Sequence, residues 1–141
     1  MKLLQCLLLL LGSLIVLGCT NDDEGGSKTL SLALAEDDSF RVLDYQVLDK
    51  PFVQAQQQGL YQAHLLNADE KVLQKISFDN INVSSTQNGN SADFYVTLPL
   101  LSKAVEIRIY QLDGSSGHYQ LNTDNRLLRW SIPDNVKQKS P

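Results

Sequence analysis

The chain has 141 residues and a mass of 15.7 kDa, the size of one domain with short extensions. Its net charge is −4, and it has no basic cluster of the kind that displaces counterions from phosphate, so nucleic acid is not expected as a partner. Both cysteines, Cys6 and Cys19, lie within the first 19 residues. The rest of the chain is therefore expected to fold without a disulfide or a cysteine metal site.

The N-terminal segment is typical of a secretory signal. Lys2 precedes an apolar run from Leu7 to Leu17 that is interrupted only by Gly12 and Ser13. As a helix, this run would cover about 16 Å, roughly half the hydrocarbon core of a bilayer. A cleaved signal is therefore favoured over a transmembrane helix.

The end of this run, Val16-Leu17-Gly18-Cys19, resembles the lipobox of bacterial lipoproteins. The resemblance implies cleavage after Gly18, a thioether from Cys19 to diacylglycerol, and acylation of the new amine. Leu17 stands where that family prefers Ala, Ser or Thr, and an ordinary secretory signal is the alternative. Thr20 replaces the Asp that usually retains Gram-negative lipoproteins in the inner membrane. The expected location is therefore the cell envelope, at the periplasmic face of the outer membrane if the organism is Gram-negative.

The remaining sequence divides into a tether, a body and a tail. After the signal peptide at 1–18, residues 19–28 are expected to form a flexible acidic tether, because they contain almost no apolar side chain. Residues 29–133 are expected to form the folded body, and residues 134–141 a flexible tail.

Apolar residues in the body recur with a period of two, which predicts β-strands. Turn-forming residues at Asn67–Glu70, Asn88–Asn90 and Asp113-Gly114 separate the strands. No window predicts a helix of ten or more residues. Seven or eight short strands in a body of this length predict an all-β, two-sheet sandwich of the immunoglobulin or fibronectin type III kind.

Two stretches resemble immunoglobulin-like accessory domains of secreted bacterial peptidases and envelope proteins. Residues 65–73 read LLNADEKVL, and residues 104–114 read AVEIRIYQLDG. The glycine that this pattern expects in the first turn is replaced by Asp69 or Glu70. The resemblance implies a binding or scaffolding role.

Residue types that support catalysis or metal binding are few, and no catalytic residue, cofactor or metal site is expected. A zinc site needs three or four ligands, and the body of the chain has only two histidines and no cysteine. His64 and His118 are therefore interpreted as surface residues. Residues 114–117 read GSSG, which is a hairpin turn without the G-x-S-x-G pattern of hydrolases. The acidic residues 36–38 could bind calcium with Ser39, Asp124 and Asn125, although a solvated loop is the simpler interpretation.

Tyr95, Arg108 and Tyr110 are the candidate binding residues. They lie off the apolar register of their strands, as do Thr97 and Glu106, and would form one patch if those strands were neighbours. The alternative is that tyrosine and threonine simply suit pleated surfaces. We expect a non-enzymatic, lipid-anchored module that binds an envelope protein partner and is held to the membrane through Cys19. A small envelope hydrolase, or a calcium- or glycan-binding module with a site built from loops, is the alternative.

Overall fold

The computed structural model describes residues 27–54, 58–79, 92–115 and 117–137. The predicted signal peptide, the predicted lipidation site Cys19 and residues 20–26 of the predicted tether lie outside the described residues. Within the described residues, no helix is long and apolar enough to cross a membrane.

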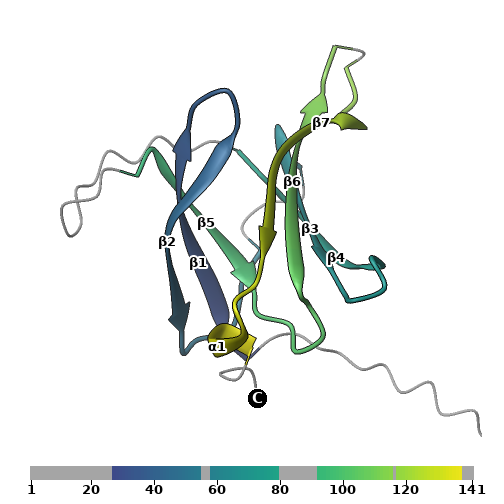
Figure 1. The fold of residues 1–141 in the computed structure, drawn as a ribbon. Helices are drawn as coiled ribbons and strands as arrows, with labels where there is room; N and C mark the ends of the chain where they lie inside the picture. The colour runs from purple at the N-terminus through teal and green to yellow at the C-terminus, as the bar shows by residue number, and fades with distance from the viewer. Residues whose placement is uncertain (1–26, 55–57, 80–91, 116, 138–141) are drawn as a thin grey trace, which may run out of the picture.

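The described residues form two antiparallel sheets that pack face to face (Figure 1). Sheet A has the order β2-β1-β5, and sheet B has the order β4-β3-β6-β7. The strands are β1 (Thr29–Glu36), β2 (Phe40–Leu48), β3 (Tyr61–Leu66), β4 (Val72–Phe78), β5 (Phe94–Pro99), β6 (Glu106–Asp113) and β7 (Gln120–Ser131). This arrangement confirms the predicted all-β sandwich.

The strand order is immunoglobulin-like in sheet B and differs in sheet A. Sheet B places β3, β6 and β7 side by side, as the immunoglobulin fold places its third, sixth and seventh strands. In that fold the second strand lies beside the fifth. Here β1 pairs with both β2 and β5, so the first two strands exchange places.

Alternate residues of the strands fill the space between the sheets, as the period of two predicts. The largest fully buried side chains include Leu32, Phe94, Leu98 and Ile107. The ring of Phe40 packs edge-on against that of Phe94, with centroids 4.9 Å apart. Burial of this apolar surface is the main stabilising contribution to such a sandwich.

Two β-bulges change which residues face the core. In β2, Leu43 is the extra residue opposite the Ala33/Leu34 step, so Phe40 and Val42 pack with the core on one side of the bulge and Tyr45 and Val47 on the other. In a strand without this bulge, Arg41, Leu43, Tyr45 and Val47 would all share one face. A second bulge lies in β4, where Leu73 is the extra residue opposite the Leu65/Leu66 step. Leu73 packs against the core.

The C-terminal end is more ordered than predicted. Residues 134–137, expected to belong to a flexible tail, form the short helix α1 (Asp134–Lys137). Val136 is only 1% exposed, and the amide of Asn135 donates a hydrogen bond to the hydroxyl of Tyr45 at 3.2 Å. The folded body therefore extends at least to Lys137, because Val136 belongs to the core.

Candidate functional site

The three predicted binding residues lie on two different faces of the sandwich. Tyr95 is on β5 of sheet A, whereas Arg108 and Tyr110 are on β6 of sheet B. Each side chain points away from the opposite sheet, so the predicted register is correct for all three. The single patch expected from the sequence is not formed, because β5 and β6 belong to different sheets.

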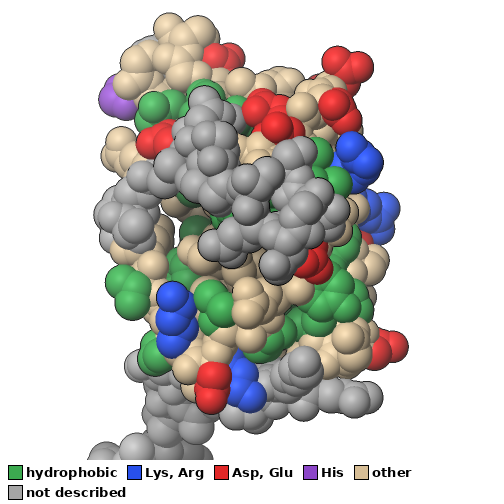
Figure 2. Space-filling view, turned by 90° about the vertical axis from the view of Figure 1, so that its left-hand side faces the viewer, with side chains coloured by type: hydrophobic (Ala, Val, Ile, Leu, Met, Phe, Trp, Pro, Cys, Tyr) green, Lys and Arg blue, Asp and Glu red, His purple; other side chains and the backbone are tan. Residues whose placement is uncertain are grey.

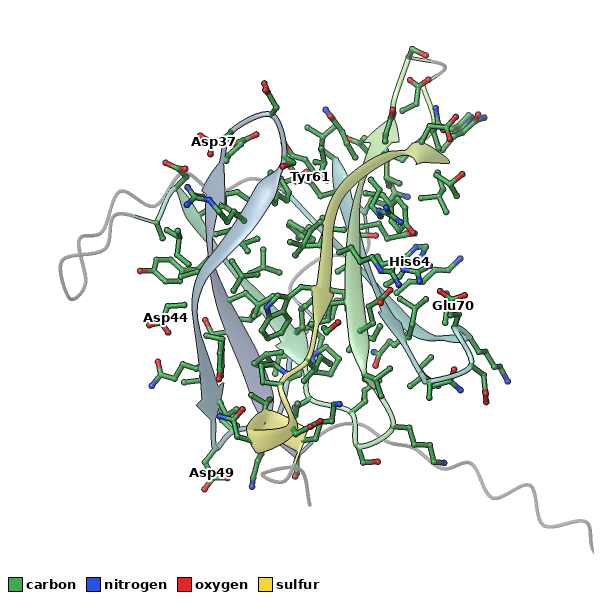
Figure 3. The ribbon with its side chains drawn as sticks, viewed as in Figure 1. Asp37, Asp44, Asp49, Tyr61, His64 and Glu70 are labelled. Carbon is green, nitrogen blue, oxygen red and sulfur yellow. The ribbon has the colours of Figure 1, made fainter. Side chains whose placement is uncertain are left out.

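The outer face of sheet B carries a row of basic and aromatic side chains. Lys75, His64, Arg108 and Arg129 are cross-strand partners, one from each of the four strands. In the next row, Gln62 lies between Ser77 and Tyr110. Figure 3 shows His64 on the side of sheet B that faces away from sheet A, with Asp44 on the opposite side of the molecule.

Carboxylates on two sides fix Arg108 in this row. Its guanidinium Nη2 donates a hydrogen bond to the Glu70 carboxylate at 2.5 Å, and its Nε donates to the Glu106 carboxylate. The hydrogen bond to Glu70, followed by that to Glu106, raises the pKa of Arg108 above its already high ordinary value. Arg108 is therefore a permanently charged group with a fixed orientation.

Glu106 joins two of these strands. Its second carboxylate oxygen accepts a hydrogen bond from Nε of Arg129 on β7 at 3.0 Å. Partial burial alone would raise the pKa of Glu106, but the hydrogen bonds from Arg108 and Arg129 outweigh it, and the pKa is lowered. Glu106 is thus ionised at neutral pH and holds β6 and β7 in register at this point.

The turn between β3 and β4 presents Glu70 to Arg108. The side chain of Asn67 accepts hydrogen bonds from the backbone N–H groups of Asp69 and Lys71 at 3.0 and 2.9 Å, which closes the turn. Glu70 has a φ of 60°, a left-handed conformation that favours glycine. Glu70 therefore adopts the backbone conformation that a glycine would supply at this position.

Tyr110 covers His64 beside this network. The two rings lie 4.9 Å apart, and both residues are buried although they face outward, with Tyr110 only 6% exposed. His64 was predicted to be a surface residue, so its burial corrects that interpretation. Burial, reinforced by the positive charges of Lys75 and Arg108, lowers the pKa of His64 to about 4. His64 is therefore neutral at pH 7.

The two outer faces differ in charge. Around the turn between β1 and β2 on the sheet A side, Glu36, Asp37 and Asp38 are all exposed. Figure 2, which views the molecule from that side, shows several acidic side chains near the upper rim. Lys75, Arg108, Arg126 and Arg129 lie on the outer face of sheet B, and we refer to these four residues as the basic face. Glu70 and Glu106 offset only part of its charge.

A pocket of about 290 Å³ opens on the same side of sheet B, beside the β6–β7 hairpin. Its lining comes from the segment before β3, from β3, β4 and β6, and from the hairpin turn. The lining residues are Gln58, Gly59, Gln62, Ser77, Leu112, Gly117, His118 and Tyr119. The sequence analysis did not identify this pocket, because its residues come from separate parts of the chain that only the fold brings together.

The other candidate sites considered in the sequence do not form ligand clusters. Among the described residues, no group of three or more His, Cys, Asp or Glu side chains could hold a metal ion. Asp37 instead pairs with Arg41 across the β1–β2 turn at 3.5 Å. Asp124 and Asn125 lie on β7 of the other sheet, and Ser116 of the GSSG turn lies outside the described residues.

Comparison with known proteins identifies no relative from which a function could be transferred. No family model, no curated protein and no solved structure matches this chain.

Proposed function

We propose that the protein is a lipid-anchored component of the bacterial cell envelope that binds a protein partner and is not an enzyme. The observation that carries this proposal is the order of parts along the chain. An apolar run ending in Val16-Leu17-Gly18-Cys19 is followed by a short acidic stretch and then by a sandwich that begins at Thr29. Among the described residues, nineteen buried side chains from Leu30 to Val136 make one core, and the proposed anchor and tether precede this core in the chain.

Fatty-acid labelling tests the anchor. Cells that express the full chain are grown with an alkyne-tagged fatty acid, and the protein is recovered and examined for the tag. We expect label on the wild-type chain and none on Cys19→Ser, whereas Cys6→Ser should keep the label because Cys6 lies upstream of the cleavage site. Labelling that survives Cys19→Ser would contradict the proposal.

The basic face is the proposed binding surface, and its charge favours a partner that presents acidic side chains. Lys75 and Arg126 are exposed, while Arg108 and Arg129 are both oriented by the carboxylate of Glu106. Complementary charge chiefly raises the rate and specificity of association, and its effect decreases with salt.

Crosslinking in intact cells tests the surface. A photo-reactive amino acid is placed at Ser131, an exposed position on β7 whose cross-strand partner is Glu106 on this face. We expect a crosslinked envelope protein that is lost in the Arg126→Glu, Lys75→Glu double variant. Arg41→Glu, an exposed charge reversal on sheet A, is the matched control and should keep the crosslink. Equal crosslinking in all three proteins would contradict the basic face as the binding surface.

The residues of the pocket can be compared with those that a hydrolase active site needs. The pocket is lined by both Ser77 and His118, but the lining residues that the structure describes include no Asp or Glu that could orient a histidine base. Ser77 also lies within the edge strand β4, one residue before its end, whereas a nucleophile elbow places its serine at a strand-to-helix turn. These features favour binding over hydrolysis.

A further inference from the structure

The pocket beside the β6–β7 hairpin combines three features that together define a ligand class. Its described lining residues provide an exposed aromatic ring and amide and hydroxyl groups in fixed positions, and none of them is acidic, a lysine or an arginine. Its volume, about 290 Å³, is at the lower end of the range for small-molecule sites.

The aromatic wall is Tyr119, whose position is set by the hairpin turn. The backbone N–H of Gly117 donates a hydrogen bond to the carbonyl of Gly114 at 3.1 Å, and Gly117 has a φ of 77°. A Cβ atom on Gly114 would lie 3.4 Å from Cε1 of Tyr119, so the ring packs closely over the glycine backbone. Tyr119 nevertheless remains 49% exposed, which leaves part of the ring available to a ligand.

Hydrogen bonds and strand pairing fix the polar floor of the pocket. Gln62 and Ser77 are cross-strand partners on β3 and β4. Nε2 of His64 lies 2.7 Å from Oε1 of Gln62. Because Oε1 of Gln62 can only accept, the Nε2–H of His64 donates this bond, and the NH₂ group of Gln62 is left as a donor for a ligand. Ser77 adds a hydroxyl that both donates and accepts.

The pocket wall at the start of β3 is held at two points. The backbone N–H of Leu112 donates to the carbonyl of Leu60 at 2.8 Å, and the N–H of Leu60 donates to the Asp79 carboxylate at 2.8 Å. These bonds connect the segment that includes Gln58 and Gly59 to β6 and to the residue after β4. The pocket is therefore preformed, which reduces the entropy lost on binding.

We propose that this pocket binds a neutral saccharide. A sugar ring presents an apolar C–H face that stacks on an aromatic ring, and hydroxyl groups that match the Gln62 amide and the Ser77 hydroxyl. An anionic ligand would lack a lysine or arginine partner in the lining, and a purely apolar ligand would leave the amide and hydroxyl without hydrogen bonds. This proposal goes beyond the protein partner proposed above, because the pocket shares no residue with the basic face.

Titration of the full chain in detergent micelles with defined saccharides tests the proposal. The probes are the trisaccharides of β1,4-linked N-acetylglucosamine, of α1,4-linked glucose and of β1,4-linked mannose, with glycerol as a polar control. We expect at least one trisaccharide to bind by calorimetry and to show saturation transfer from the protein by NMR, while glycerol does not bind. If no trisaccharide binds more tightly than glycerol, the proposal is overturned.

Substitutions then locate the site. Tyr119→Ala should weaken binding at least tenfold, and Gln62→Leu several-fold. Leu121→Ala is the matched control, because Leu121 is a similarly exposed apolar residue on the same hairpin and lies outside the pocket. An unchanged affinity in Tyr119→Ala, with a melting temperature like that of the wild type, would also overturn the proposal. Neither result bears on the labelling of Cys19 or on crosslinking at the basic face, so the two proposals fail independently.

Discussion

The carboxylate of Glu70 accepts a hydrogen bond from Arg108 at 2.5 Å while the Glu70 backbone adopts a φ of 60°. A left-handed conformation is unfavourable for a residue with a Cβ atom, and glycine would adopt it without that cost. The contact therefore connects a strained position of the β3–β4 turn to the centre of the basic face. It gives a physical reason why this turn carries glutamate where glycine would fit the backbone better.

Two substitutions at Glu70 separate the conformational effect from the charge effect. Glu70→Gly removes both the strain and the ion pair, so the free energy of unfolding should stay constant or rise by up to about 1 kcal/mol. Glu70→Ala keeps the strain and loses the pair, and should lower it by roughly 0.5 to 1 kcal/mol. Urea denaturation followed by circular dichroism measures both. A glycine variant less stable than the alanine variant would contradict this account.

Tyr110→Ala should destabilise the domain by about 3 kcal/mol, because it truncates a buried ring and exposes His64 to water. From the sequence, Tyr110 was expected to be an exposed binding residue whose removal barely alters stability. Ile107→Ala, in the sandwich core, should cost about 2 to 5 kcal/mol. Tyr119→Ala, which truncates a half-exposed ring, should change stability by less than about 0.5 kcal/mol. A melting temperature of Tyr110→Ala equal to that of Tyr119→Ala would show that the outward ring does not contribute to folding.

Much of the fold could be predicted because alternation of apolar residues reports burial directly. Leu30, Leu32 and Leu34 alternate with small or polar residues and all lie in the core. The pattern could not place the bulge at Leu43, since an inserted residue reverses the alternation without any change in composition. Nor does alternation identify the middle of β7 as strand, because residues 122–126 carry no apolar side chain.

The candidate site was less predictable, because it depends on which strands are neighbours. Strand register correctly placed Tyr95, Arg108 and Tyr110 on outer faces, but sequence alone could not assign β5 and β6 to different sheets. The burial of Tyr110 and His64 depends on their contact across β3 and β6, which are far apart in sequence. The sequence pattern indicates the outward register of both side chains, but it does not indicate that β3 pairs with β6 and brings them into contact.

The stability of the domain should fall as the pH drops from 7 to 5. The pKa of His64 is about 4 in the folded protein, whereas the ordinary value is 6.5. Between these values the unfolded chain binds a proton at His64 and the folded protein does not, so acid favours unfolding. The loss begins near pH 7, ends near pH 4, and amounts to roughly 3 kcal/mol at most.

Urea denaturation at pH 7, 6 and 5 measures this loss. The measurements stop at pH 5 because Glu106 has a lowered pKa in the folded protein. Its protonation adds a second loss of stability below its ordinary pKa of 4.5. His64→Gln should flatten the dependence of the unfolding free energy on pH in this window. His118→Gln is the matched control at an exposed histidine and should retain it. A slope that persists in His64→Gln would contradict the assignment to His64.

The helix α1 should contribute to folding although it follows the last strand. Val136 is buried in the core, so Val136→Ala should lower the free energy of unfolding by about 2 kcal/mol. Lys137→Ala removes only a surface ion pair with Asp134 at 2.8 Å and should change it by less than about 0.5 kcal/mol. A chain that ends at Pro133 loses the packing of Val136 and the hydrogen bond from Asn135 to Tyr45, and should be the least stable of the three. Thermal melting of the three proteins beside the wild type measures the order. Equal melting temperatures for the truncated and wild-type chains would restore the boundary at residue 133 that the sequence indicated.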